Sequence, residues 1–331
     1  MTNRLSFVVP VRNDAVRLRR CLASIRANHA PNAEIELVVA DNGSTDGSQA
    51  VAASAGARVL DLPGLRVSEL RNRAAAIASG EIMAFVDADH EIGDGWVQAA
   101  LDVFVDPAVG GAGALYVSPA GSWVQRMYGI LRGGTTGRHD VGWLGSGNLI
   151  VRRETFAAIG GFDASLETCE DVDFCQRLTA SGWRLIADER LRSVHLGDPS
   201  TLAALFRGER WRGRDNVRVT FRGSLSLRDL PSVLIPIVQA LALVALVSGA
   251  IAIPFVGGRA IAVTAVSVGV IVGLSALRTA RMVATGGVRW PSALGQAFLV
   301  ALTYDLARAV ALLGRAPHHR RPVADAPPTI A

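Results

Sequence analysis

Short apolar runs alternate with segments of helical periodicity through residues 5–195. Apolar runs bounded by turn residues predict buried strands, and apolar residues three and four positions apart predict helices that pack by one face. Strands that alternate with helices predict an α/β fold with a doubly wound, mostly parallel sheet. The predicted strands are 5–10, 36–41, 57–60, 81–86, 111–117, 145–151, 184–186 and 192–195, and the predicted helices are 14–27, 48–55, 68–78, 95–105, 154–159 and 170–180.

Residues 121–142 interrupt this alternation. The segment is rich in glycine, arginine and aromatic residues and shows no clear period. A loop of this length inside a compact domain is usually functional or mobile. We therefore predict a long loop here, and expect it to influence which ligand the protein accepts.

The composition changes after residue 230. Residues 233–256 carry no charge and are long enough to span a bilayer, and 260–277 are also uncharged and close to the lower length limit. These runs predict two membrane spans, with a buried core hairpin as the alternative. Residues 291–313 contain Gln296, Asp305 and Arg308, and charge in hydrocarbon is costly. This last segment is therefore predicted to be an amphipathic helix at the interface, with a third span as the alternative.

The arginines predict the orientation of these segments. Arg278, Arg281 and Arg289 follow the second apolar run, and further arginines stand at 315, 320 and 321. The positive-inside rule places both groups in the cytoplasm, together with the N-terminal domain, at the inner (plasma) membrane. The resulting parts are an α/β domain at 1–200, a juxtamembrane segment at 201–230, a membrane region at 231–314 and a tail at 315–331.

The juxtamembrane segment interleaves arginine with aromatic side chains, including Trp211 and Phe221. It is interpreted either as an interfacial segment that holds phosphate groups near the bilayer or as a general anchor to anionic lipid. Such a pattern also occurs in proteins that bind nucleic acid. Its position next to a membrane span argues against that class.

Charge and cysteine content further limit the kinds of ligand, site and compartment expected for the protein. The net charge is +5 and the chain contains no lysine, so its basic side chains are arginines, which suit phosphate recognition. The three cysteines, Cys21, Cys169 and Cys175, are odd in number and lack paired spacing, which argues against a disulfide framework or a zinc site. A reducing compartment is expected. The N-terminus enters a strand directly and lacks a signal-peptide pattern.

Two carboxylates end the apolar run 81–86. Asp87 and Asp89 are separated by one small residue, so both point to the same side of an extended strand. Ligands of open α/β sheets bind beyond the carboxyl ends of the strands. Two hard oxygen donors there suit Mg²⁺ or Mn²⁺, and hence a diphosphate. The alternative is a pair of loop aspartates, one of which caps the next helix.

Four motifs, in order, resemble glycosyltransferase family 2, which has the GT-A fold. They are the segments 8–13 (VVPVRN), 41–48 (DNGSTDGS), 87–89 (DAD) and 160–163 (GGFD) with 170–173 (EDVD). The resemblance covers about residues 5–195. It implies transfer of a sugar from a nucleotide diphosphate donor to an acceptor, with inversion and with Mg²⁺ or Mn²⁺ as cofactor.

The resemblance also implies roles on the donor side. Asp41 would accept a hydrogen bond from the base, or else bond its own turn. Pro10, Val11 and Arg12 would line the base and ribose, although the family often has an aromatic residue at the position of Arg12. Arg71 would approach the nucleotide, unless it is a solvated helix residue. Asp87 would sit near the ribose and take part in metal binding, Asp89 would bind the metal, and His195 would complete the metal site or be structural.

On the acceptor side, the resemblance places the catalytic base on Asp171, for which a helix-start role is the alternative. Glu170 and Asp173 should raise the pKa of Asp171 through like charge. Glu170 belongs to the same acceptor-side segment, and Asn148 and Trp143 would line the acceptor pocket or pack a loop.

The expected function is a membrane-anchored inverting glycosyltransferase. Its partners would be a nucleotide diphosphate sugar, membrane lipid and a lipid-linked or glycan acceptor, with no nucleic acid. A non-catalytic membrane scaffold of the same fold is one alternative. A nucleotidyltransferase is the other, although residues 10–14 lack the Gly-rich, basic phosphate loop usual after its first strand.

Overall fold

The computed structural model describes residues 3–31, 33–119, 121–222, 230–288 and 291–314. These residues form two compact units, each described here by itself. Among the described residues, the first unit contains those within 3–119 and 134–197, and the second contains those within 121–133 and 198–314. Arg289, the arginines at 315, 320 and 321, the tail and part of the predicted juxtamembrane segment lie outside the described residues.

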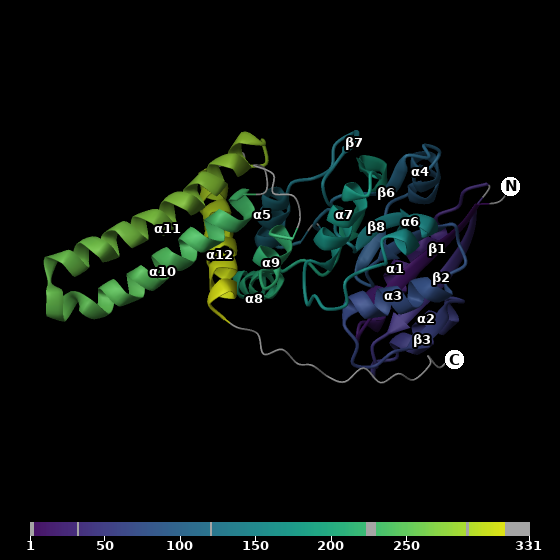
Figure 1. Cartoon of the computed structure of the whole chain (residues 1–331), viewed down its shortest axis with the longest axis horizontal. Helices are drawn as coiled ribbons and strands as arrows, with labels where there is room; N and C mark the ends of the chain where they lie inside the picture. Colours follow the sequence, from purple (N-terminus) through teal and green to yellow (C-terminus); the bar gives the residue numbers. More distant parts are fainter. Residues whose placement is uncertain (1–2, 32, 120, 223–229, 289–290, 315–331) are drawn as a thin grey trace. The chain divides into compact units, whose positions relative to one another are not determined.

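The first unit is built on an eight-stranded sheet with the order β3-β2-β1-β4-β8-β6-β9-β7 (Figure 1). Strands β3, β2, β1 and β4 run parallel, as do β6 and β9, whereas β8 is antiparallel to both β4 and β6 and β7 to β9. The strands are β1 (Asn3–Val11), β2 (Ala33–Asp41), β3 (Arg58–Asp61), β4 (Ile82–Val86), β6 (Val109–Gly113), β7 (Arg138–Asp140), β8 (Asn148–Arg152) and β9 (Arg184–Asp188).

Alternate residues of the central strands pack into two separate apolar clusters. Phe7 and Val9 of β1 join one cluster, and Val8 between them joins the other. Successive side chains of a strand point to opposite faces, so the sheet is covered on both sides. Helices α1 (Ala15–Ala27), α2 (Ser48–Ser54) and α4 (Trp96–Val103) cover the first face, and α3 (Val67–Ile77), α6 (Arg153–Ala158) and α7 (Glu170–Ala180) cover the second. The predicted mostly parallel α/β sheet is confirmed.

The segment 121–142 is not the long loop predicted. It contains helix α5 (Trp123–Arg132) and the edge strand β7. Ser122 and Gln125 form a reciprocal capping box at the start of α5, and Val124, Met127 and Tyr128 bury its apolar face. The S-x-x-Q pattern and the spacing of these three residues were legible in the sequence. The many glycines around them obscured the helical period.

Two further local features depend on contacts that the sequence pattern does not show. Asp14 precedes α1 but makes no side-chain cap, and Asp46 of the second loop instead accepts a hydrogen bond from Ala15 N at 2.8 Å. A short strand that was not predicted, β5 (His90–Ile92), follows directly after the aspartate pair. It pairs antiparallel with β10 (Ser193–His195) to form a separate two-stranded ribbon.

The second unit is helical. It contains α5, α8 (Leu202–Arg212), α9 (Asn216–Thr220), α10 (Leu230–Val256), α11 (Gly258–Ala284) and α12 (Pro291–Leu313). The last three are long and apolar enough to cross a membrane. Helices α10 and α11 form a hairpin, and α12 runs across its base rather than along it (Figure 1).

The charges of α12 are paired within this unit. Asp305 is buried and accepts hydrogen bonds from Ser275 at 3.2 Å and from Arg278 at 2.8 Å, both on α11. Arg308 bonds the buried Glu209 of α8 at 2.8 Å, and Glu209 also accepts from Tyr128 of α5 at 2.6 Å. Pairing lowers the cost of removing these charges from water. The charges of α12 therefore do not prevent this helix from lying in a membrane.

Candidate functional site

A cleft opens where three neighbouring parallel strands end. Pro10 and Val11 end β1 and Arg12 follows it, Asn42 follows β2, and Asp87 to Asp89 follow β4. Asp14, Val67 and Leu70 complete the lining. The carboxyl edge of an open parallel sheet is the usual place for a ligand. The structure thus brings together the first and third sequence motifs, which lie more than 70 residues apart in the chain.

The loops after β1 and β2 are joined by reciprocal hydrogen bonds. Asn13 N donates to Ser44 Oγ at 2.9 Å, and Asn13 Oδ1 accepts from Thr45 N at 2.8 Å. Asn13 has a positive φ of 50°, a conformation that asparagine tolerates better than most residues. These bonds hold the two loops together at the carboxyl ends of β1 and β2.

Asp41 ends β2, directly before Asn42 of the cleft lining, and keeps one acceptor atom unused. The residue is fully buried, and its Oδ1 accepts from Ser44 N at 2.7 Å and from Gln49 Nε2 at 3.2 Å. Its Oδ2 has no hydrogen-bond partner among the described residues. A buried acceptor without a partner is costly, so this atom is suited to receive an N–H group from a ligand.

Arg71 connects the donor-side and acceptor-side motifs. Its guanidinium is buried and bonds Asp87 Oδ1 at 2.6 Å and Glu170 Oε1 at 2.7 Å. Only 2% of its side chain is exposed, so the structure places it as a bridge between carboxylates and not as a solvated helix residue. Breaking such a buried ion pair costs several kcal/mol of stability. Arg71 therefore holds Glu170 and Asp87 in fixed positions relative to each other.

Asp171 lies next to this bridge. Its Oδ1 accepts from Val172 N at 2.8 Å and its Oδ2 from Ser146 N at 3.4 Å. Burial and the neighbouring charge of Glu170 raise the pKa of Asp171 to about 7. The carboxylate that the resemblance assigned as base therefore has a pKa near neutrality, where a general base works best.

The dipeptide 146–147 separates Asp171 from the aspartate pair. Ser146 faces Asp171 and also bonds Glu170 through its hydroxyl at 3.2 Å. A methyl group added at Gly147 would lie 2.8 Å from Asp87 Oδ2 and 3.0 Å from His90 Nε2. The absence of a side chain at Gly147 therefore leaves space between the two groups of carboxylates.

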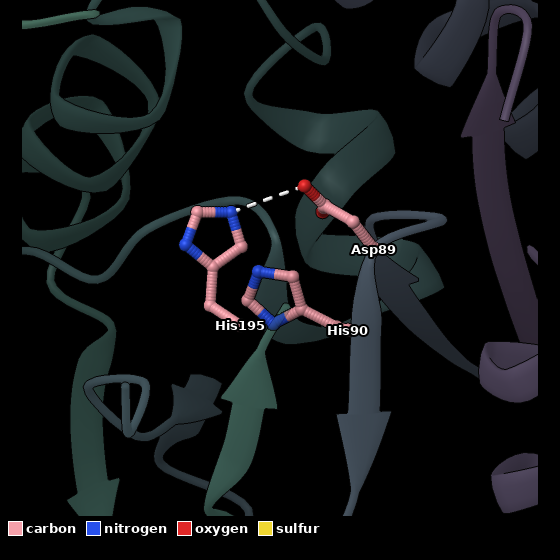
Figure 2. Close-up of side chains that lie close together, drawn as sticks. All are labelled: Asp89, His90 and His195. Atoms are coloured by element: carbon pink, nitrogen blue, oxygen red, sulfur yellow. Dashed lines mark ion pairs between the residues drawn. The ribbon is translucent and has the colours of Figure 1, made fainter. Parts of the chain in front are cut away.

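A second cluster of potential ligands stands at the edge of the cleft (Figure 2). His195 Nε2 lies 3.2 Å from Asp89 Oδ2, and atoms of Asp89, His90 and His195 lie within 4.8 Å of one another. Although burial opposes ionisation of Asp89, the hydrogen bond from His195, both imidazoles and Arg17 hold its pKa well below its usual range. This carboxylate is therefore ionised at neutral pH and suited to hold a cation.

Asn148 and Trp143 are placed differently from each other. Asn148 is fully buried, and its amide donates to the carbonyls of Leu191 at 2.7 Å and Ala114 at 3.2 Å, which ties β8 to the core. Trp143 is 49% exposed. Of the two alternatives for Asn148, lining a pocket or packing, its hydrogen bonds in the structure are those of a packed residue.

Sequence reasoning missed several members of the site. His90 adjoins the aspartate pair and could have been noticed as a ligand type at that position. Arg17 contacts Asp14 at 2.7 Å and Asp89 at 3.7 Å from a turn of α1, and Ser146 bonds both acidic residues that begin α7. No local signal marks Arg17 or Ser146, because their roles depend on contacts across the fold.

Comparisons with known proteins identify the family of the chain. The family model described as "Glycosyl transferase family 2" matches residues 6–157. An N-acetylglucosaminyl-diphospho-decaprenol L-rhamnosyltransferase of Mycobacterium tuberculosis is 30% identical over 286 residues, which cover 69% of this chain and 92% of that protein. A pre-mycofactocin glycosyltransferase of the same organism is 29% identical over 195 residues, covering 55% of this chain and 40% of that relative.

The fold also resembles solved structures, among them one that aligns with most of the chain. A mannosyltransferase of Pyrobaculum calidifontis, determined in complex with GDP-Man and Mn²⁺, aligns with a TM-score of 0.60 at 17% identity. The alignment covers 95% of this chain and 88% of that one. At this identity the likeness concerns the fold.

Proposed function

The chain belongs to glycosyltransferase family 2, and from this premise we propose that it is an inverting glycosyltransferase acting on a lipid-linked acceptor. The donor is a nucleotide diphosphate sugar bound in the cleft beyond β1, β2 and β4. The observation that carries the proposal is the buried bridge through Arg71. It links Asp87 of the aspartate motif to Glu170, which begins α7 next to Asp171.

The donor side offers a place for each part of a nucleotide. The unused Oδ2 of Asp41 matches an N–H group of the base, and Pro10, Val11 and Arg12 line the adjoining wall. Asp87 is directed by Arg71 and is suited to accept a hydrogen bond from the ribose. Arg17 at the cleft edge adds positive charge where the diphosphate would lie.

Asp89 and His195 fit a divalent cation. Their ligand atoms are 3.2 Å apart, and one is an ionised carboxylate oxygen. A bound cation would act as a Lewis acid that offsets the negative charge developing on the departing nucleoside diphosphate.

Asp171 supplies the base for a single displacement. The acceptor hydroxyl attacks the anomeric carbon, its proton passes to the Asp171 carboxylate, and the bond from the anomeric carbon to the diphosphate oxygen breaks. Attack opposite the leaving group inverts the anomeric configuration. Ser146 N and Val172 N orient the carboxylate for this transfer.

The helices of the second unit support a lipid-linked acceptor. The α10–α11 hairpin exposes Leu241, Val244, Val247 and Ile251, which suits contact with lipid chains. Because α12 crosses the base of the hairpin, we propose two spans with α12 at the interface. This topology keeps the N-terminal domain at the cytoplasmic face of the inner membrane. The decaprenol-linked acceptor in the name of the rhamnosyltransferase relative points to the same acceptor class.

The proposal is tested by incubating purified full-length protein in nanodiscs with Mn²⁺, nucleotide sugars, and polyprenyl phosphate or polyprenyl-diphosphate saccharides. Sugar transfer is expected for one donor, and NMR of the product should show an anomeric configuration opposite to that of the donor. If no donor is consumed, or if the product retains the donor configuration, the proposal is wrong.

The pH profile provides a separate prediction. Because the pKa of Asp171 is about 7 and only the ionised carboxylate accepts a proton, the rate should fall about tenfold per pH unit below 7 and level off above it. Glu170→Gln removes the neighbouring charge that raises this pKa, so the midpoint should move to lower pH. A profile that is flat between pH 5.5 and 8, measured under single-turnover conditions, would contradict the assignment of the base.

A further inference from the structure

The imidazole of His90 adjoins the proposed cation site without a role in the chemistry above. Only 1% of the residue is exposed, and its ring stands 4.7 Å from the His195 ring, measured between centroids. The antiparallel register of β5 and β10 sets His90 directly opposite His195. Residues opposite each other in such a pair project to the same face. The two-stranded ribbon therefore places both imidazoles close to the Asp89 carboxylate.

The ring of His90 is oriented by its own hydrogen bond. Its Nδ1 lies 2.9 Å from the hydroxyl of the buried Ser193 on β10. Its second nitrogen, Nε2, is on the side of the ring that faces Asp89 and His195 (Figure 2). Histidines that bind metals are commonly held in this way, with one nitrogen bonded to a neighbouring group and the other directed at the ion.

Space around Nε2 is kept open by a glycine. A Cβ at position 147 would approach Nε2 to 3.0 Å, tighter than ordinary van der Waals contact. The rings of Tyr116 and His90 pack at right angles with 4.7 Å between centroids, which limits rotation of the imidazole. The hydrogen bond at Nδ1 and the Tyr116 ring therefore hold the imidazole in place, and the lack of a side chain at position 147 avoids a close contact with Nε2.

We propose that His90 is a direct ligand of the cation, so that two imidazoles and the Asp89 carboxylate select a transition-metal ion over Mg²⁺. This inference rests on the proposed metal-dependent sugar transfer and adds which kind of cation the site would select. Mg²⁺ prefers oxygen ligands and near-ideal octahedral geometry, whereas imidazole nitrogen favours transition metals such as Mn²⁺, Co²⁺ and Zn²⁺ over Mg²⁺. Replacing an oxygen ligand by a second nitrogen therefore shifts preference away from Mg²⁺.

The test is Mn²⁺ binding by the full-length protein in nanodiscs, with and without UDP or GDP. Pulsed EPR is expected to show nitrogen couplings from two histidines in the unmodified protein and from one in His90→Gln. His90→Gln should weaken Mn²⁺ binding by at least about 10-fold to 100-fold, the loss typical even for residues that only support a ligand. Mg²⁺ binding, measured by competition, should change less, so the preference for Mn²⁺ should shrink.

Matched variants separate ligation from folding. His139→Gln changes an exposed imidazole on β7 and should leave both nitrogen couplings and Mn²⁺ affinity unchanged. Ser193→Ala removes the partner of Nδ1 and should weaken Mn²⁺ binding while both couplings persist.

Coupling from a single histidine in the unmodified protein, or unchanged couplings in His90→Gln, would overturn the proposal. If His90→Gln does not fold, the number of couplings in the unmodified protein decides. These readouts require no sugar transfer, so failure of the proposed function is detected separately.

Discussion

Asp171→Asn is expected to lower the rate of sugar transfer by roughly 10²-fold to 10⁴-fold, the usual contribution of a positioned general base. Asparagine preserves the size of the side chain and an oxygen that can accept from Val172 N. It cannot accept the proton of the attacking hydroxyl. Donor binding should remain, since the cleft beyond β1, β2 and β4 does not include this residue. Single-turnover kinetics and titration with UDP or GDP in the presence of Mn²⁺ measure the two effects.

Asp171→Asn should increase the stability of the fold above about pH 7, although it lowers the rate of transfer. The folded-state pKa of Asp171 is raised, so the stabilising contribution of this group is present at low pH and is lost as the pH rises through about 7. Above that pH, Asp171→Asn removes an unfavourable buried charge and should raise Tm. The control is Asp173→Asn, which makes the same change two positions along α7, where the carboxylate pairs with Arg177 at 2.8 Å. Comparable loss of transfer in both variants would argue against a specific role for Asp171.

Asp89→Asn is expected to abolish cation-dependent binding of the donor. The ionised carboxylate of Asp89 supplies the negative charge of the ligand cluster, and an amide is a much weaker ligand for a divalent ion. A bound cation contributes several kcal/mol to charge stabilisation in such sites, so transfer should fall by about 10²-fold or more. Calorimetry with UDP or GDP and Mn²⁺ should show affinity in the unmodified protein that EDTA removes, and little in the variant.

Asp94→Asn provides the matched control. Asp94 is exposed in the turn before α4, five residues from Asp89, and its replacement should leave nucleotide affinity and transfer unchanged. If Asp89→Asn retains EDTA-sensitive nucleotide binding at the original affinity, the cation is held elsewhere and the assignment of this site is wrong.

Local pattern was sufficient for most elements of the fold. The apolar runs and turn residues placed β1, β2 and β4 within a few residues, and α7 and α12 begin where they were expected. Each of these depends on periodicity and on signals within a single segment. Helix α5 was missed because its capping box lies among glycines. Strand β5 was missed because three residues carry no periodicity of their own, and its pairing partner is about 100 residues away.

The sequence by itself determined the family, most of the strands and helices along the chain, the carboxylates that follow β4 and begin α7, and the apolar character of the last three helices. These follow from the spacing of residues along one segment. Only the tertiary structure decided that Arg71 joins Asp87 to Glu170, that Asp171 is partly buried beside a like charge, and that His90 faces His195. The physical reason is that charge pairing, desolvation and ligand geometry depend on distances between segments. Sheet order and strand register set those distances, and neither is written in the local pattern.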